Sequence, residues 1–118
     1  MIGDWLAVDI LNRTLRAGPV WVSIHNLEPG GSGAGEITGD GYARQLGAFD
    51  EATVLDGAAN ADVIEFLSVG AQRITHLGVW DAKTGGHFLW GAPLPIPRTL
   101  QADDGFRIRP GILRFHVG

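Results

Sequence analysis

The first pattern along the chain is helical. Between Asp4 and Arg16, apolar side chains recur at steps of three and four, which places them along one face of a helix. Asp4 can cap this helix at its N-terminus, and Gly18 followed by Pro19 ends it. The pattern therefore predicts an amphipathic helix over residues 4–16, with a broad apolar face made of Trp5, Leu6, Val8, Ile10, Leu11 and Leu15.

From Val20 onward the period changes to two, as in a β-strand. In Val20–Asn26, valine and isoleucine point to one side while Trp21, Ser23 and His25 point to the other. Apolar residues on both faces indicate either a central strand between two layers or a face that a partner covers. Further strand-like segments recur about every ten residues: Tyr42–Phe49, Thr53–Leu55, Ala61–Phe66, Ile74–Trp80, His87–Trp90, Thr99–Ala102, Phe106–Arg109 and Ile112–Val117.

Glycine, proline and aspartate separate these segments. The glycine-rich stretch Gly30–Gly41 is typical of a mobile hairpin loop, and Asp56–Asn60 is typical of a turn. Asp81–Gly86 predicts a hairpin between its flanking strands. Alternating prolines cannot donate hydrogen bonds within a central strand, so we expect an extended edge or a linker at Pro93, Pro95 and Pro97.

One helix followed by seven or eight short strands predicts a mainly β fold, specifically an antiparallel β-sandwich or jelly-roll-like domain. At 118 residues, 45% hydrophobic and 19% charged, the chain has the composition of a globular protein and the length of one domain. We therefore expect a single domain over residues 1–118, with the helix at 4–16 and the β-sandwich at 19–118.

Charge and hydropathy narrow the classes of partner. The net charge is −4, and the nine basic residues, of which Lys83 is the only lysine, are scattered, so we expect no nucleic-acid partner. Apolar runs are too short for membrane insertion, and the N-terminus lacks the features of a secretory signal. Cysteine is absent, so disulfides contribute nothing to stability.

Reactive groups form no recognisable site. The glycine run is not followed by a helix, which a phosphate-binding loop requires. Ser23 and Ser68 lie outside a nucleophile elbow, and the carboxylate pairs Asp50–Glu51 and Asp103–Asp104 point to opposite faces of an extended chain. We therefore expect no enzyme activity and no cofactor. We also expect no metal site, since one histidine falls on each of four separate strands: His25, His76, His87 and His116.

The aromatic residues are the strongest candidates for function. They favour three interpretations: packing in the core, burial against a partner subunit, or exposed platforms that stack on sugars. The apolar helix face poses the same choice between core and docking. The residues that we predict for a partner interface are Trp5, Leu11, Trp21, Tyr42, Trp80 and Trp90.

Four segments in order resemble a known family. They are Gly41-Tyr-Ala-Arg-Gln45, Ile74-Thr-His-Leu-Gly-Val-Trp-Asp81, Leu89-Trp-Gly-Ala-Pro-Leu94 and Phe106-Arg-Ile-Arg-Pro-Gly111. Together with the helix and the glycine-rich loop after Pro29, this layout resembles the small tail-fibre or minor tail proteins of tailed bacteriophages over nearly the whole chain. The sequence departs from the family pattern at Pro93, which interrupts a Gly-Ala-Leu segment.

The resemblance implies a structural subunit of a virion, assembled in the host cytoplasm, that lacks a cofactor and forms homo-oligomers and contacts with other virion proteins. A tail-tip, tail-fibre or minor tail protein is the main hypothesis. Two alternatives stay open: a capsid (head) decoration or fibre-base protein, and a host-receptor or carbohydrate-binding module in which Trp21, Trp80 or Trp90 stacks on a host surface glycan.

Overall fold

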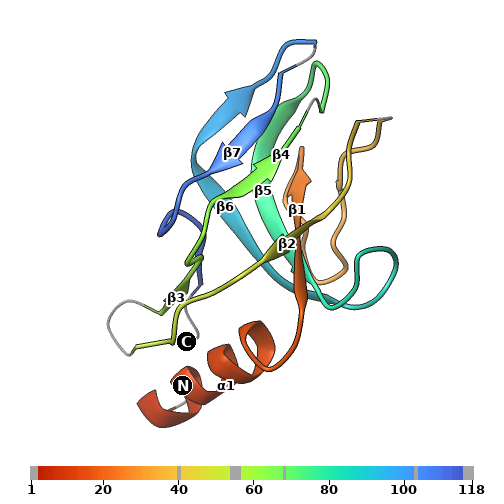
Figure 1. Ribbon diagram of the computed structural model, residues 1–118. Helices are drawn as coiled ribbons and strands as arrows, with labels where there is room; N and C mark the ends of the chain where they lie inside the picture. The colour runs from red at the N-terminus through yellow and green to blue at the C-terminus, as the bar shows by residue number, and fades with distance from the viewer. Residues whose placement is uncertain (1–2, 40, 54–56, 68, 103, 116–118) are drawn as a thin grey trace.

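The computed structural model describes residues 3–39, 41–53, 57–67, 69–102 and 104–115. One helix, α1 (Asp4–Leu15), precedes eight strands in the described residues (Figure 1). The strands are β1 (Val20–His25), β2 (Gln45–Gly47), β3 (Ala58–Ala59), β4 (Ile64–Phe66), β5 (Arg73–Trp80), β6 (Phe88–Thr99), β7 (Phe106–Ile108) and β8 (Arg114–Phe115).

Helix α1 lies at one end of the elongated molecule (Figure 1). The predicted cap is wrong: Asp4 is the first helical residue, the extended Gly3 precedes it, and no side chain caps the helix. Of the predicted apolar face, only Leu11 and Leu15 are fully buried, and Val8 is partly buried against the core. A hydrogen bond from the backbone N–H of Ala52 to Asn12 Oδ1 (2.9 Å) also attaches the helix to the body.

The largest sheet has four antiparallel strands in the order β2-β1-β5-β6. Strand β1 is central, and its residues are buried on both faces, which confirms the central-strand interpretation. Its register with β5 places Trp21 opposite Trp80 and His25 opposite His76. The predicted hairpin is also confirmed, since β5 pairs with β6 across the turn at residues 81–87.

Strand β6 is longer than predicted and runs through all three alternating prolines. It lies at the edge of the sheet, as the prolines require. Its register with β5 is interrupted, because Ile74 pairs with Arg98 whereas His76 pairs with Pro93. The residues between Pro93 and Arg98 therefore bulge out of the ladder. Trp90, the last residue of the predicted strand His87–Trp90, lies near the start of this longer edge strand.

Two short antiparallel ladders, β4–β7 and β3–β8, complete the fold. Strand β3 forms inside the predicted turn at 56–60, because the buried Asn60 holds this segment against the C-terminal residues. The predicted strand Tyr42–Phe49 shortens to β2, and of the predicted strand Thr99–Ala102 only Thr99 is in a strand, as the last residue of β6. The parts of the predicted strands at residues 54–55 and 116–117 lie outside the described residues.

One hydrophobic cluster joins the helix, the four-stranded sheet and both ladders. The buried side chains of β4 and β7 (Ile64, Phe66, Phe106 and Ile108) belong to the same cluster as those of β1 and β5. In Figure 1 the β4–β7 ladder lies in front of β5 and β6. The predicted mainly β, antiparallel fold with one N-terminal helix is confirmed, and its sheets are compatible with the predicted sandwich.

Candidate functional site

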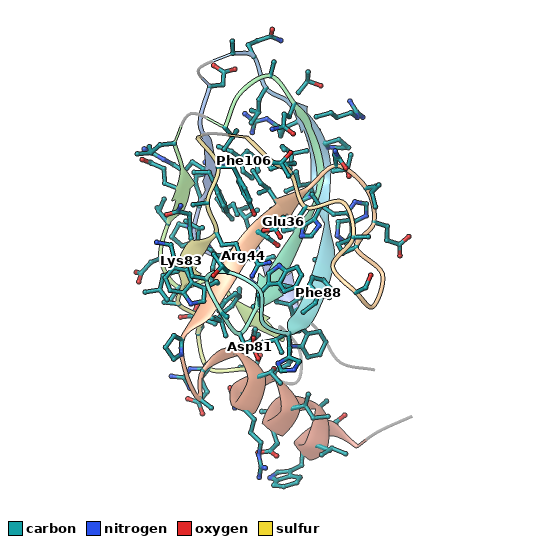
Figure 2. The ribbon with its side chains drawn as sticks, turned by 90° about the vertical axis from the view of Figure 1, so that its right-hand side faces the viewer. Glu36, Arg44, Asp81, Lys83, Phe88 and Phe106 are labelled. Atoms are coloured by element: carbon teal, nitrogen blue, oxygen red, sulfur yellow. The ribbon has the colours of Figure 1, made fainter. Side chains whose placement is uncertain are left out.

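The glycine-rich loop carries one side of a polar cluster inside the molecule. Glu36 from this loop receives two hydrogen bonds from Arg44, from Nε and from Nη2, each 2.9 Å long. The hydroxyl of Tyr42 donates a third hydrogen bond to Glu36 (2.6 Å). Figure 2 shows Glu36 and Arg44 side by side in the middle of the molecule. Specific contacts therefore hold the Glu36 part of the glycine-rich loop in place.

Arg44 also fixes the β5–β6 hairpin. Its Nη1 donates to the backbone carbonyls of Ala82 (3.0 Å) and Gly85 (2.8 Å). Its guanidinium lies over the ring of Trp80, 3.8 Å from the centroid. Arg44 is only 8% exposed, so this one side chain links the glycine-rich loop, the start of β2 and the hairpin turn from within.

These contacts join two of the segments that carry the family resemblance. Tyr42 and Arg44 belong to the Gly-Tyr-Ala-Arg-Gln segment, whereas Trp80 and Asp81 close the segment that starts at Ile74. Asp81 receives hydrogen bonds from the backbone N–H of His87 (2.6 Å) and pairs with its ring Nδ1 (2.8 Å). The segments therefore have a structural role, which is to hold the loop and hairpin in place.

The electrostatics of the cluster follow from its burial and its pairing. Burial alone would raise the pKa of Glu36, but the hydrogen bonds from Arg44 and Tyr42 outweigh it and hold the pKa below its ordinary value. Burial and the bond to Glu36 raise the pKa of Tyr42 well above its usual range. Glu36 is therefore a carboxylate and Tyr42 a neutral phenol at neutral pH.

A second cluster of hydrogen-bonded polar side chains, made of Ser23 and His25, contacts the indole of Trp80. Trp80 Nε1 donates to Ser23 Oγ (2.9 Å), which is 2.6 Å from His25 Nε2. His25 Nδ1 donates to the carbonyl of Ala34 (2.8 Å), so Nε2 is free to accept the serine proton. Burial lowers the pKa of His25, which keeps the ring neutral. A serine–histidine pair can form a nucleophile, but Ser23 and His25 are both 0% exposed, so no substrate reaches them here.

The histidines do not converge on a metal site in the described residues. His25 is bonded inside the core, His76 is hydrogen bonded to Thr75 on β5, and His87 lies in the hairpin turn rather than on a strand. His116 lies outside the described residues.

The six predicted interface residues lie in different environments. Leu11 and Trp80 pack inside the chain's own core at 2% and 9% exposure, so they offer little surface to a partner. Tyr42 is half-buried in the polar cluster. Trp21 is half-buried with Lys83 Nζ 5.7 Å from its ring centre, and Trp90 donates from Nε1 to Thr14 Oγ1 (2.9 Å).

Trp5 differs from the other five. It is 76% exposed at the free end of α1, next to Leu6 at 41%. We term these two residues the helix tip. Because Arg44 covers one face of Trp80, a carbohydrate platform at that residue has less support than an apolar contact at the helix tip.

Two features were missed by sequence reasoning. The first is the pairing of Glu36 with Arg44, which no local pattern indicates. The second is a surface between β6 and β7, where Ile96 is 75% exposed beside arginines. The alternation of Arg107 and Arg109 with buried residues of β7 was a usable signal for this second feature.

No helix in the part of the chain that the structure describes has the length and apolar character needed to span a membrane. A search of curated proteins gives no match. A comparison with protein families matches residues 1–116 to the family described as podophage GP4 fiber I protein gp80. The chain belongs to this family. Its members are phage fibre proteins, so the resemblance to tail-fibre proteins is confirmed and the chain has a structural role in a phage tail fibre.

Proposed function

We propose that this chain is a virion subunit that builds a tail fibre through protein–protein contacts, both with other virion proteins and with further copies of itself. The membership of a fibre family over residues 1–116 is the observation that carries this proposal. The same observation supports a fibre position over a decoration on the capsid head. In this role the chain works by contact, without a catalytic step, and it joins the particle during assembly in the host cytoplasm.

The helix tip is the contact that we propose for assembly. At the C-terminal end of the helix, Leu11 and Leu15 are used internally, since each is 2% exposed. Trp5 is left uncovered at 76%. Covering a large apolar side chain contributes roughly 2–3 kcal/mol, and tryptophan is enriched at the centres of interfaces. Trp21 and Trp90, half-buried on the body, are further candidates for the rim of such a contact.

The experiment compares Trp5→Ser with Leu27→Ser, which changes an apolar side chain that is 49% exposed just beyond the end of β1 that lies farther from the helix. Light scattering of the purified chain measures its oligomeric state, and mass spectrometry of purified particles measures incorporation. We expect Trp5→Ser to lower the oligomer fraction and the incorporation, while Leu27→Ser changes neither. A wild-type chain that stays monomeric and is absent from particles contradicts the proposed function. Equal behaviour of the two variants contradicts the role of the helix tip.

A further inference from the structure

Two adjoining hollows, of about 500 Å³ and 340 Å³, lie along β7 on the part of the molecule away from the helix. They share the lining residues Arg98, Phe106, Arg107 and Arg109. The larger hollow extends toward β4, and the smaller one extends toward the bulged segment of β6. We term this surface the basic groove.

The positive charge of the basic groove is only partly compensated. Arg107 pairs with Glu65 across the β4–β7 ladder at 2.6 Å. Within the described residues, Arg98 and Arg109 form no ion pair, and the guanidinium of Arg98 lies 5.9 Å from the ring centre of Phe106. Two exposed cations without an ion-pair partner among the described residues gather on this surface, which contrasts with the net charge of −4 of the whole chain.

The walls of the basic groove are apolar. Ile96 is 75% exposed and Ile112 is 44% exposed. Ile96 lies between Pro95 and Pro97, whose rings restrict the backbone, in the part of β6 that bulges away from β5. The exposed isoleucine is therefore held outward by the local backbone, and the groove offers a fixed apolar contact beside its cations.

We propose that the basic groove binds an acidic peptide segment of another virion protein. Carboxylates of that segment pair with Arg98 and Arg109, and an apolar side chain between them packs against Ile96 and Ile112. Arginine suits this task because its planar guanidinium pairs with a carboxylate through two hydrogen bonds. A sugar fits less well, because the aromatic ring in the groove, Phe106, is only 5% exposed and offers no stacking face. The proposal rests on the proposed function, since it names a partner within the fibre.

The first experiment measures binding of the full chain to a labelled peptide that alternates glutamate and leucine, by fluorescence anisotropy. The matched peptide carries glutamine in place of every glutamate. We expect the acidic peptide to bind, the glutamine peptide to bind at least about tenfold more weakly, and salt to weaken binding. The double variant Arg98→Gln/Arg109→Gln loses binding by about tenfold or more, and Ile96→Ser weakens it severalfold.

Arg16→Gln is the matched control, because Arg16 is an exposed arginine at the end of α1. Thermal melting of each variant shows that it is folded, as expected for substitutions at exposed positions. Failure of the wild-type chain to bind the acidic peptide overturns the proposal. So does an equal loss of binding in Arg16→Gln, or equal binding of the two peptides.

The second experiment identifies the occupant in the particle. A photoreactive amino acid at position 96 is cross-linked in purified virions, and mass spectrometry sequences the attached peptide. We expect an acidic segment of a different virion protein. A neutral or basic segment, a second copy of this chain, a glycan, or no adduct overturns the proposal. Because detection of the chain itself in these virions tests the proposed function separately, failure of the groove and failure of the fibre role are distinguishable.

Discussion

The guanidinium of Arg44 lies 3.8 Å from the centre of the Trp80 ring in the interior of the molecule. The same group hydrogen bonds to Glu36 on one side and to the hairpin carbonyls of Ala82 and Gly85 on the other. One side chain thus connects the glycine-rich loop to the hairpin turn, about 40 residues further along the chain. This arrangement fixes the position of the glycine-rich loop relative to the hairpin turn.

Arg44→Met tests this arrangement. The substitution keeps an unbranched side chain against Trp80 but leaves Glu36 without its cation. Breaking a buried pair by removing one partner is strongly destabilising, so we expect the free energy of unfolding to fall by about 3 kcal/mol in urea denaturation. Arg16→Met, at an exposed position, is the control and should change the free energy of unfolding little. Equal effects of the two substitutions would show that the interior pairing contributes nothing.

The stability of the fold should decrease as the solution becomes acidic. His25 is neutral in the folded chain because burial lowers its pKa below the ordinary value of 6.5, whereas the unfolded chain takes up a proton near that value. The unfolded state then binds more protons, so stability is complete above pH 6.5 and falls as the pH drops toward the folded pKa. Glu36, whose pKa is also lowered, adds a loss only below its ordinary value of 4.5.

The measurement is the free energy of unfolding at about pH 7.5 and about pH 5.5. We expect a lower value at the acidic pH in the wild-type chain and a smaller difference in His25→Gln, which removes the titrating ring. A difference of the same size in both proteins would assign the pH dependence to other groups.

Gly78 is required by the serine–histidine pair. A Cβ at this position would lie 2.6 Å from Ser23 Oγ and 2.7 Å from His25 Nε2, both fully buried. We expect Gly78→Ala to destabilise the fold by about 1–3 kcal/mol, because an added methyl in a packed core displaces its neighbours. Gly31→Ala, with open space around it, is the matched control. Thermal denaturation measures the stability of both variants. A Gly78→Ala variant as stable as the control would refute the close packing of Gly78 against Ser23 and His25.

Asn60 positions the C-terminal part of the fold. Its Nδ2 donates to the carbonyls of Asp62 (2.9 Å) and Arg109 (3.0 Å), and its Oδ1 accepts from the N–H of Leu113 (2.9 Å). Asn60→Asp keeps the acceptor but turns the two donated bonds into contacts between oxygens at a site that is 0% exposed. We expect a loss of about 3 kcal/mol in unfolding free energy. The exposed Asn26→Asp is the control, and a similar small loss in both would contradict this role.

Part of this fold could be predicted from the sequence. The helix, the strand Val20–His25 and the β5–β6 hairpin follow from apolar periodicity and turn residues, and the prolines of β6 predict its edge position. Local patterns of this kind report which face of a segment is buried. They therefore predict the helices and strands that are held in place by apolar side chains packed in the core.

The remaining features depend on polar side chains that are buried because a distant partner satisfies them. Arg44 is buried because it donates hydrogen bonds to Glu36 and to the carbonyls of the hairpin turn. The alternation of the sequence around Arg44 predicts a strand over Tyr42–Phe49, but only Gln45–Gly47 forms one. The sequence around Asn60 predicts a turn, but this segment contains β3, which pairs with β8. The same limit applies to the interface residues: a stripe at helical spacing cannot show that Leu11 is covered and Trp5 is not.

The central claim is that this chain is a built-in part of a phage fibre and works by contact. Quantitative mass spectrometry of density-purified particles, washed at high salt, tests it most directly. We predict that the chain remains in the particles at a fixed ratio to the other tail proteins. A chain that is abundant in infected cells but falls to background in the washed particles would contradict the claim.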